Sequence, residues 1–158
     1  MPVTIASPRD LLLHLLGELL YVERRLADDV LRRLVEAVRD EELASALRAH
    51  LPQTAQHAER VETAFRRLEA APSSNLSRSF ESAVAQHDEL AAAIASTPLA
   101  DLHHAAAALR TEHWEIAAYE TLLRVAPADV ADLLRPSLEE EREAAAALLD
   151  AIGRLGAR

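Results

Sequence analysis

The chain has 158 residues, of which 50% are hydrophobic and only 3% aromatic, and its formal net charge is −9. This apolar fraction argues against disorder, and the apolar residues are mainly Ala and Leu, which favour helices over strands. The acidic charge argues against nucleic acid or an anionic membrane as a partner, and the absence of cysteine excludes disulfides and thiolate ligands. No apolar run is long enough to cross a bilayer. We therefore expect a cytoplasmic, all-helical protein that forms a single domain over residues 1–158.

Caps and helix breakers predict where the helices begin and end. Ser7 before Pro8, and Thr97 before Pro98, have the pattern of a capping residue followed by proline in the first turn. Asp40 has the character of an N-cap for another helix. These signals predict four long helices and one short one, over about residues 8–39, 41–70, 79–95, 98–125 and 128–153.

The lengths of the connections predict how the helices are arranged. The first two long helices and the last two are joined by very short links, so each pair is expected to form an antiparallel hairpin. The link between the hairpins is long and carries the short helix, so it can return along their full height. We therefore predict a ferritin-like four-helix bundle, in which a short crossover helix joins the second and third long helices.

Two prolines lie inside the predicted helices. Pro52 and Pro136 each remove one backbone hydrogen bond, so each predicts a kink. Ser137 and Glu140 have the spacing of a capping box, which leaves open the alternative that the last helix begins again there.

Every long helix carries a side chain of metal-ligand type within its apolar stripe. A helix buries positions that recur at three and four residues, and tracing these positions identifies the interruptions. In the first helix, Glu23 stands at the centre of a stripe of leucines. The other three stripes contain such side chains at His50, Gln53, His57, Glu112, Glu115 and Glu141.

The positions of these side chains along the hairpins predict that they share one depth. Glu23 and His57 lie equally far from the first hairpin turn, and Glu112 and Glu141 lie at similar distances from the second. Packing the two hairpins together is therefore expected to bring all the candidate ligands into one layer. These candidates are Glu23, Gln53, His57, Glu112, Glu115 and Glu141.

Four glutamates in one buried layer are costly as bare anions, because each loses its hydration and like charges repel. Taken singly, a buried glutamate is more often a core polar group that is satisfied by hydrogen bonds. The coincidence of depth and face favours a metal centre over that interpretation. Carboxylates together with imidazole suit iron or manganese, and zinc less specifically, so we predict two Fe or Mn ions per subunit.

Two further side chains are expected next to the ligands. His50 is interpreted as support for the ligand His57. Tyr119 is interpreted as a core aromatic residue whose hydroxyl bonds to a carboxylate of the site.

Other charged or histidine-rich stretches are interpreted as surface. Of residues 139–141, only Glu141 is expected to point inward. The adjacent residues His103 and His104 cannot share one helical face, so we expect them on the surface or at an interface. His87 lies on the short helix and is expected on a solvated face.

Segments in every predicted helix resemble a known family. They are LLH at 12–14, GELLYVERRL at 17–26, HL at 50–51, QT at 53–54, His57, QHDEL at 86–90, RTEHWEIAAYE at 110–120 and LEEER at 138–142. Together they resemble the YciE/YciF-type ferritin-like proteins over nearly the whole chain. This resemblance implies a ferritin-like bundle, a homodimer and a dinuclear metal site, but no particular reaction.

The sequence leaves more than one function open. The first is a non-haem di-metal carboxylate centre that oxidises its metal or reduces peroxide in stress protection, with a small oxidant as co-reactant. The second is a dimeric helical module without enzymatic activity, because the sequence lacks the paired Glu-x-x-His motifs of di-iron proteins and has Gln53 among its ligands. A third is an adaptor that uses an exposed helix face. The absence of a phosphate-binding glycine loop and of a nucleophile elbow excludes nucleotide-binding and serine-hydrolase functions.

Overall fold

The computed structural model describes residues 4–157, and within that range it consists of helices without a strand. This confirms the expected all-helical class. None of the described helices combines the length and the apolar character needed to span a membrane. The elements in chain order are α1 (Pro8–Arg25), the π-helix η1 (Leu26–Val30), α2 (Leu31–Ala37), α3 (Glu41–Arg67), α4 (Arg78–Ala93), α5 (Thr97–Val125) and α6 (Ala128–Gly156).

Side-chain caps explain where the first helices begin. The hydroxyl of Ser7 accepts a hydrogen bond from the backbone N–H of Asp10 (3.1 Å) at the start of α1. The carboxylate of Asp40 accepts one from the backbone N–H of Leu43 (3.0 Å) at the start of α3. The buried carboxylate of Asp101 in α5 accepts hydrogen bonds from the backbone N–H groups of Asp40 and the residue before it (2.9 Å each). Asp101 therefore holds the tight turn between α2 and α3 in place.

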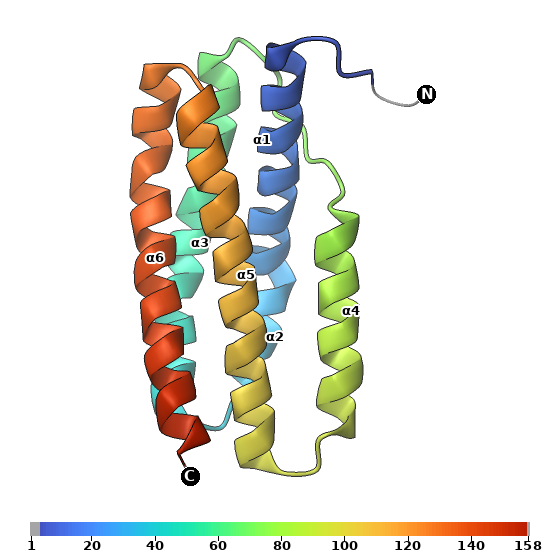
Figure 1. The fold of residues 1–158 in the computed structure, drawn as a ribbon, viewed down its shortest axis with the longest axis vertical. Coiled ribbons are helices and arrows are strands. Elements are labelled where there is room, and N and C mark those ends of the chain that lie inside the picture. Colours follow the sequence, from blue (N-terminus) through green and yellow to red (C-terminus); the bar gives the residue numbers. More distant parts are fainter. Residues whose placement is uncertain (1–3, 158) are drawn as a thin grey trace.

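The helices run side by side along the long axis of the molecule (Figure 1). α1 and α2 run in one direction, α3 and α5 run in the other, and α6 returns in the direction of α1. α3 packs against α1 and α6, and α5 packs against α1 and α6, whereas α4 lies on the outside next to α5. The four elements that carry the interrupted stripes therefore enclose a common interior.

The first helix differs from the single α-helix expected over residues 8–39. Between Leu26 and Val30 it is a π-helix, in which the backbone N–H of Leu31 donates to the carbonyl oxygen of Leu26. Such short π-helical segments occur frequently at functional sites, because they change the direction of the side chains that follow. This one begins three residues after Glu23.

Neither interior proline ends its helix. α3 continues through Pro52, and α6 continues through Pro136. The alternative that the last helix begins again at Ser137 is wrong, because α6 is continuous there. The hydroxyl of Ser137 instead accepts a hydrogen bond from the guanidinium of Arg60 in α3 (3.0 Å).

The connection between α3 and α4 crosses α1 at Gly17. The backbone N–H of Asn75 donates to the carbonyl oxygen of Gly17 (2.9 Å), and the side-chain amide of Asn75 donates to the carbonyl oxygen of His14 (3.1 Å). A Cβ atom at position 17 would collide with the side chain of Asn75. Glycine at position 17 therefore allows the side chain of Asn75 to approach α1 closely.

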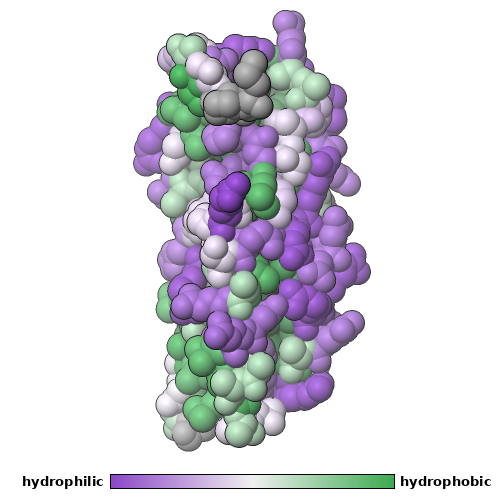
Figure 2. Space-filling model, turned by 90° about the vertical axis from the view of Figure 1, so that its right-hand side faces the viewer, coloured by the Kyte–Doolittle hydropathy of each residue, from purple (hydrophilic) through white to green (hydrophobic). Residues whose placement is uncertain are grey.

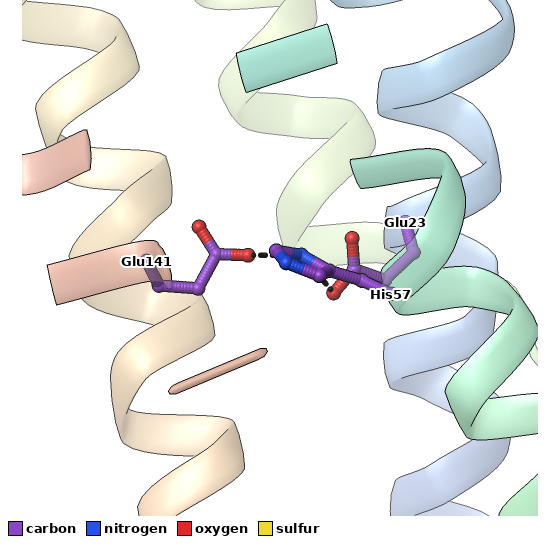
Figure 3. Close-up of side chains that lie close together, drawn as sticks. All are labelled: Glu23, His57 and Glu141. Atoms are coloured by element: carbon purple, nitrogen blue, oxygen red, sulfur yellow. Dashed lines mark ion pairs between the residues drawn. The ribbon is translucent and has the colours of Figure 1, made fainter. Parts of the chain in front are cut away.

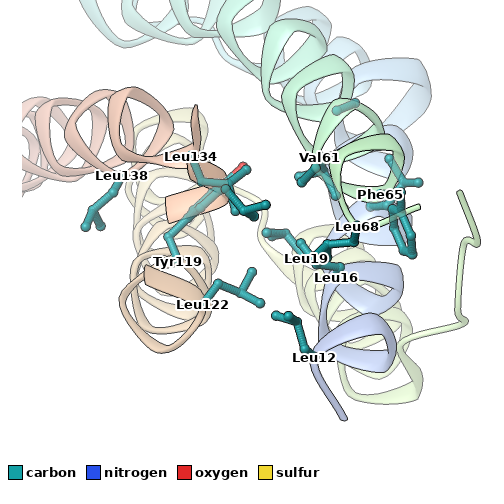
Figure 4. Packing of buried hydrophobic residues seen from close by; sticks show 14 residues of the cluster. Leu12, Leu16, Leu19, Val61, Phe65, Leu68, Tyr119, Leu122, Leu134 and Leu138 are labelled. Atoms are coloured by element: carbon teal, nitrogen blue, oxygen red, sulfur yellow. The ribbon is translucent and has the colours of Figure 1, made fainter. Parts of the chain in front are cut away.

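Two hydrophobic clusters fill the interior on either side of a polar layer. The first, drawn in Figure 4, includes Leu16, Phe65 and Leu134. The second includes Leu43 and Leu148. In α3, α5 and α6, the polar interruptions of the stripe fall between the residues of one cluster and those of the other, and in α1 Glu23 lies between Leu20 of the first cluster and Leu26 of the second. The polar layer is therefore shielded from solvent at both ends by packed apolar side chains.

Candidate metal centre

Six side chains with metal-ligand atoms lie in this polar layer, and all of them are buried. Their exposed fractions are 5% or less. Helical periodicity explains the placement, because residues that are three, four or seven positions apart share one face of a helix. The six are Glu23 of α1, His50 and His57 of α3, Glu112 and Glu115 of α5, and Glu141 of α6.

Glu23, His57 and Glu141 form a first donor group (Figure 3). One ligand atom from each lies within 4.8 Å of the other two. Nδ1 of His57 is 2.8 Å from Oε1 of Glu141 and 3.5 Å from Oε1 of Glu23, and Figure 3 shows the ring between the two carboxylates. Ligand atoms held about 2.1 Å from one metal ion lie roughly 3 Å from each other, so this spacing is compatible with one ion.

His50, Glu112 and Glu141 form a second donor group beside the first. Nε2 of His50 is 3.3 Å from Oε2 of Glu141 and 3.5 Å from Oε2 of Glu112. Glu141 therefore belongs to both groups, with one carboxylate oxygen facing each histidine. The layer contains two adjacent sets of donors that share one carboxylate.

Hydrogen bonds outside the layer determine which nitrogen of each histidine faces it. Nδ1 of His50 is 3.0 Å from Oε1 of Gln53, and Nε2 of His57 is 2.8 Å from Oε2 of Glu140. Both oxygens can only accept, so these nitrogens carry the N–H groups that donate. The guanidinium of Arg60 in turn donates to Glu140 (2.6 Å). Metal-binding histidines characteristically donate their outer N–H to a carbonyl or carboxylate in this way.

Several buried ligand atoms have no hydrogen-bond partner within the described part of the chain. Buried polar atoms in folded proteins almost always have one. The contacts between His57 and the two carboxylates are close but lack the alignment of a hydrogen bond. The unpartnered atoms of the layer are Oε2 of Glu23, Nδ1 of His57, Oε2 of Glu112, and both carboxylate oxygens of Glu115 and of Glu141.

Comparisons with known proteins identify the family. Residues 7–157 match the family model described as a domain of unknown function, DUF892. The chain belongs to this family. Protein YciF from Escherichia coli (strain K12) is 30% identical over 141 residues, a match that covers 84% of this chain and 82% of that protein.

Two solved structures resemble this DUF892 chain closely. YcfI from Rhodopseudomonas palustris has a TM-score of 0.89 at 30% identity, covering 94% of this chain and 96% of its own. The crystal structure of the E. coli stress protein YciF has a TM-score of 0.87 at 28% identity, covering 98% and 99%. The all-helical fold described above is therefore shared with solved proteins of the YciF type.

Burial and close contacts change the pKa values in the polar layer of this DUF892 chain. Burial raises the pKa of Glu112 and of Glu115 well above the ordinary range. Burial alone would lower the pKa of His57, but the carboxylates of Glu141 and Glu23 outweigh it and raise that pKa to about 10. Burial alone would raise the pKa of Glu141, but the imidazoles beside it outweigh it and lower that pKa. Without a cation, the surroundings in the layer therefore favour the protonated forms of His57, Glu112 and Glu115.

Tyr119 and Glu115, which are also predicted at the site, are members of neither donor group. The hydroxyl of Tyr119 donates to Oε1 of Glu23 (2.5 Å), as expected for a core aromatic residue beside the site. Glu115 is fully buried and has no hydrogen-bond partner for its oxygens among the described residues, but it belongs to neither donor group. It lies close enough to Glu141 and Glu23 for their charges to raise its pKa further.

On α3, the structure places His50 rather than Gln53 next to the carboxylates. Gln53, expected as a ligand, is half-buried, and its side-chain oxygen accepts the hydrogen bond from His50. His50, expected as a supporting residue, directs Nε2 at Glu112 and Glu141. The two residues are three positions apart on one helix, so periodicity could not rank them.

The expectation that only Glu141 of residues 139–141 points inward is wrong for Glu140. Its carboxylate is 24% exposed and contacts both His57 and Arg60. The sequence contains one signal for this contact, because Arg60 follows His57 by three residues and so shares its helical face.

Of the histidines expected on a solvated face, on the surface or at an interface, His104 is instead buried within the chain, whereas His87 and His103 remain partly exposed. His104 is only 6% exposed, and its Nδ1 is 2.9 Å from Nε2 of His87. The rings of His87 and His103 stack with their centres 4.8 Å apart. These three residues, called the histidine cluster below, join α4 to α5.

Proposed function

We propose that the chain is a ferritin-like four-helix bundle with α4 in its crossover, and that its buried polar layer binds two iron or manganese ions. The observation that carries this proposal is the set of unpartnered ligand atoms on Glu23, His57, Glu112, Glu115 and Glu141. Each buried polar atom without a partner costs roughly 1–3 kcal/mol of stability. Cations held by the two donor groups would satisfy the atoms of Glu23, His57, Glu112 and Glu141 at once.

The donor types suit the proposed ions. Carboxylate oxygens with imidazole nitrogen favour iron or manganese over metals that prefer thiolate. Glu23 and His57 would hold one ion, and His50 and Glu112 the other. Glu141, which faces both histidines, would be shared between them. Two divalent cations would also balance the charge of the four buried glutamates in the layer.

The residues around the ligands orient them. The carbonyl oxygen of Gln53 holds the outer N–H of His50, and the carboxylate of Glu140 holds that of His57. Each histidine therefore presents a nitrogen lone pair to the layer. Because Arg60 bonds to Glu140, the orientation of His57 also depends on the packing of α3 against α6.

Bound iron or manganese would supply electron-transfer chemistry, such as oxidation of the metal or reduction of a peroxide, with a small oxidant as co-reactant. The hydroxyl of Tyr119, which donates to Oε1 of Glu23, would hold that carboxylate in place beside the metal. The similar E. coli protein is a stress protein, and protection against oxidants is the form of stress response that this chemistry supports.

A second function is favoured by the contacts of His57. When protonated, its ring lies between the carboxylates of Glu141 and Glu23, so the layer can balance part of its charge without a cation. That arrangement suits a dimeric helical module with no enzymatic activity and a degenerate metal site. A structural role has been suggested for the similar protein YcfI.

The proposal also covers the domain organisation, the oligomeric state, the location and the partners of the chain. We propose one domain, a homodimer, a cytoplasmic location and no binding of nucleic acid or membrane, since the net charge of −9 repels anionic surfaces. Sedimentation equilibrium distinguishes a chain of 17.3 kDa from a species of twice that mass. A mass equal to that of the single chain would contradict the homodimer.

Anaerobic titration of chelator-treated protein with Co(II) tests the metal centre. The unaltered protein is expected to bind two ions per chain and to melt at a higher temperature when loaded. The double variant Glu23→Leu, Glu112→Leu removes one carboxylate from each donor group and should bind none. The matched control is Glu139→Leu, which removes an exposed carboxylate of α6 and should leave both ions bound.

Two results together would instead support the second function, a helical module with a degenerate metal site. In that case neither Co(II) nor Fe(II) remains on the unaltered protein after desalting, and the double leucine variant is at least as stable as the unaltered protein. Removing buried charge would then only relieve the cost of desolvation. If the ions do bind, peroxide consumption by the iron-loaded protein tests the proposed chemistry separately.

A further inference from the structure

A cavity of about 980 Å³ lies between α4, α5 and the segment from η1 to α2. Its walls are mainly apolar and include Leu26 and Val30 of the π-helix, Phe80 of α4 and Ala107 of α5. The lining residue Leu90 is 51% exposed, so the cavity reaches the surface along α4. Apolar cavities of roughly 300–1,000 Å³ with a few polar groups are typical binding sites for small organic molecules.

The cavity exists because polar contacts attach α4 to the other helices. Phe80 is the only buried side chain described for this helix. Glu81 pairs with Arg25 (2.9 Å), and Asp88 pairs with Arg33 (3.1 Å). Figure 2 shows this face of the molecule, with polar side chains across its middle and hydrophobic ones gathered towards its lower end. α4 therefore covers the apolar surface without filling the space beneath it.

The two ends of the cavity differ in chemistry. α5 lines it from His103 to Trp114, a span of about 17 Å at ~1.5 Å per residue. At one end lies the histidine cluster of His87, His103 and His104. The other end reaches Glu112, which is only 3% exposed and belongs to the second donor group of the polar layer. The cavity therefore connects the surface with the candidate metal centre.

We propose that this cavity binds an unbranched aliphatic carboxylate of medium length. Its carboxylate group lies at the histidine cluster, and its chain follows α5 towards Glu112. A span of about 17 Å holds roughly 14 bonds of an extended chain, and the apolar walls suit methylene groups.

Charge determines the orientation of the ligand. Nε2 of His104 makes no bond among the contacts described, and it can donate to a carboxylate when Nε2 of His87 donates to Nδ1 of His104 (2.9 Å). Asp88 at that end is already paired with Arg33 (3.1 Å) and His87 (3.0 Å). At the opposite end, Glu112 stands next to other buried carboxyl groups, so a second anion there would be repelled.

The consequence for chemistry rests on the proposed function, because the far end of the chain would lie beside Glu112 and hence beside the proposed ions. The substrate of the centre would then be an aliphatic organic acid. Binding in the cavity does not itself require a metal, so the two proposals can be tested apart.

Trp114 is the only tryptophan of the chain and lines the cavity, so its fluorescence reports binding directly. Titration of chelator-treated protein with dodecanoate is expected to give a saturable change with one molecule bound per chain. Ala83→Phe places a ring at the cavity wall and should weaken binding at least about tenfold. Ala85→Phe is the matched control, because Ala85 is also exposed on α4 but does not line the cavity.

Spin-labelled dodecanoates test the orientation. A nitroxide at the far end of the chain is expected to quench Trp114 more strongly than a nitroxide next to the carboxylate. Stronger quenching by the second probe would place the carboxylate near Arg110, which also lines the cavity, and would overturn the proposed orientation.

Other results would overturn the ligand site itself. Absence of saturable dodecanoate binding would do so, as would equal weakening by Ala83→Phe and Ala85→Phe. If dodecanoate does not bind and Ala83→Phe changes the sedimenting mass, the cavity is a contact between copies of the chain. Dodecanoate binding by a protein that binds no Co(II) would support the ligand site and contradict the metal centre alone.

Discussion

Histidines gather at two places in this chain, and their neighbours give them opposite properties. In the polar layer, the carboxylates beside His57 outweigh its burial and raise its pKa to about 10. In the histidine cluster, His87, His103 and His104 contact one another, with Asp88 alongside His87. There, burial and the two neighbouring imidazoles lower the pKa of His104.

The difference shows that converging histidines do not by themselves form a metal centre. Both three-donor groups found among the described residues lie in the polar layer, and each combines one histidine with two glutamates. In the histidine cluster, four of the six ring nitrogens already bond to the protein. Nε2 of His87 is 2.9 Å from Nδ1 of His104, and Nε2 of His103 donates to the carbonyl oxygen of His87 (3.1 Å).

Removing the carboxylate of Glu141, which both donor groups share, is expected to have the largest effect on metal binding. Glu141→Gln keeps the shape of the side chain but removes its charge from both donor groups. Loss of a residue that only supports a ligand already lowers metal affinity by about 10–100-fold, so we expect a loss of more than about 100-fold for both ions. Co(II) absorption titration measures it. His103→Gln, in the histidine cluster, should leave Co(II) binding unchanged, and two ions retained by Glu141→Gln would contradict the shared position.

Removing the carboxylate that supports His57 is expected to have the next largest effect on metal binding. Glu140→Ala removes the acceptor of the outer N–H, so the ring can turn and its tautomer is no longer determined. Co(II) affinity is expected to fall by about 10–100-fold, mainly at the first donor group. Glu139→Ala is the control, because Glu139 is the next carboxylate along α6 and bonds only to the exposed Arg142 among the contacts described. Equal affinities of the two variants would remove Glu140 from the site.

The polar layer could be predicted from the sequence because it depends on local geometry. The stripes of α1, α5 and α6 identify Glu23, Glu112 and Glu141 as buried, since each stands at a position where its helix otherwise places mainly apolar residues. Their common depth follows from the lengths of the hairpins. Neither inference needs knowledge of how one helix contacts another.

The remaining features depend on contacts between helices. Glu140 lies beside the stripe of α6 and reaches His57 only because α3 and α6 pack closely. His104 is buried because α4 brings His87 to it. The π-helix over residues 26–30 is a change of hydrogen-bond register that needs no unusual composition, so periodicity does not reveal it.

The buried carboxyl of Glu115 in the polar layer is expected to destabilise the metal-free protein. Glu115 is fully buried, and its oxygens have no hydrogen-bond partner among the described residues. Glu115→Leu should therefore raise the free energy of unfolding of chelator-treated protein by about 1–3 kcal/mol, as measured by urea denaturation. Glu89→Leu, an exposed change on α4, is expected to stay within about 0.5 kcal/mol. A loss of stability in Glu115→Leu would mean that its carboxyl has partners in solution.

The smallest expected effect is that of His104, in the histidine cluster, on how the free energy of unfolding depends on pH. The pKa of His104 is lowered in the folded protein, whereas an unfolded histidine titrates near 6.5. Between these two values the unfolded chain binds more protons than the folded chain, so stability is lost as the pH falls below about 6.5. His104→Gln should therefore flatten the fall in the free energy of unfolding on the acid side, measured by urea denaturation at a series of pH values. His113→Gln, an exposed change on the same helix, should leave that slope unaltered, and equal slopes in the two variants would show that His104 is not the group responsible.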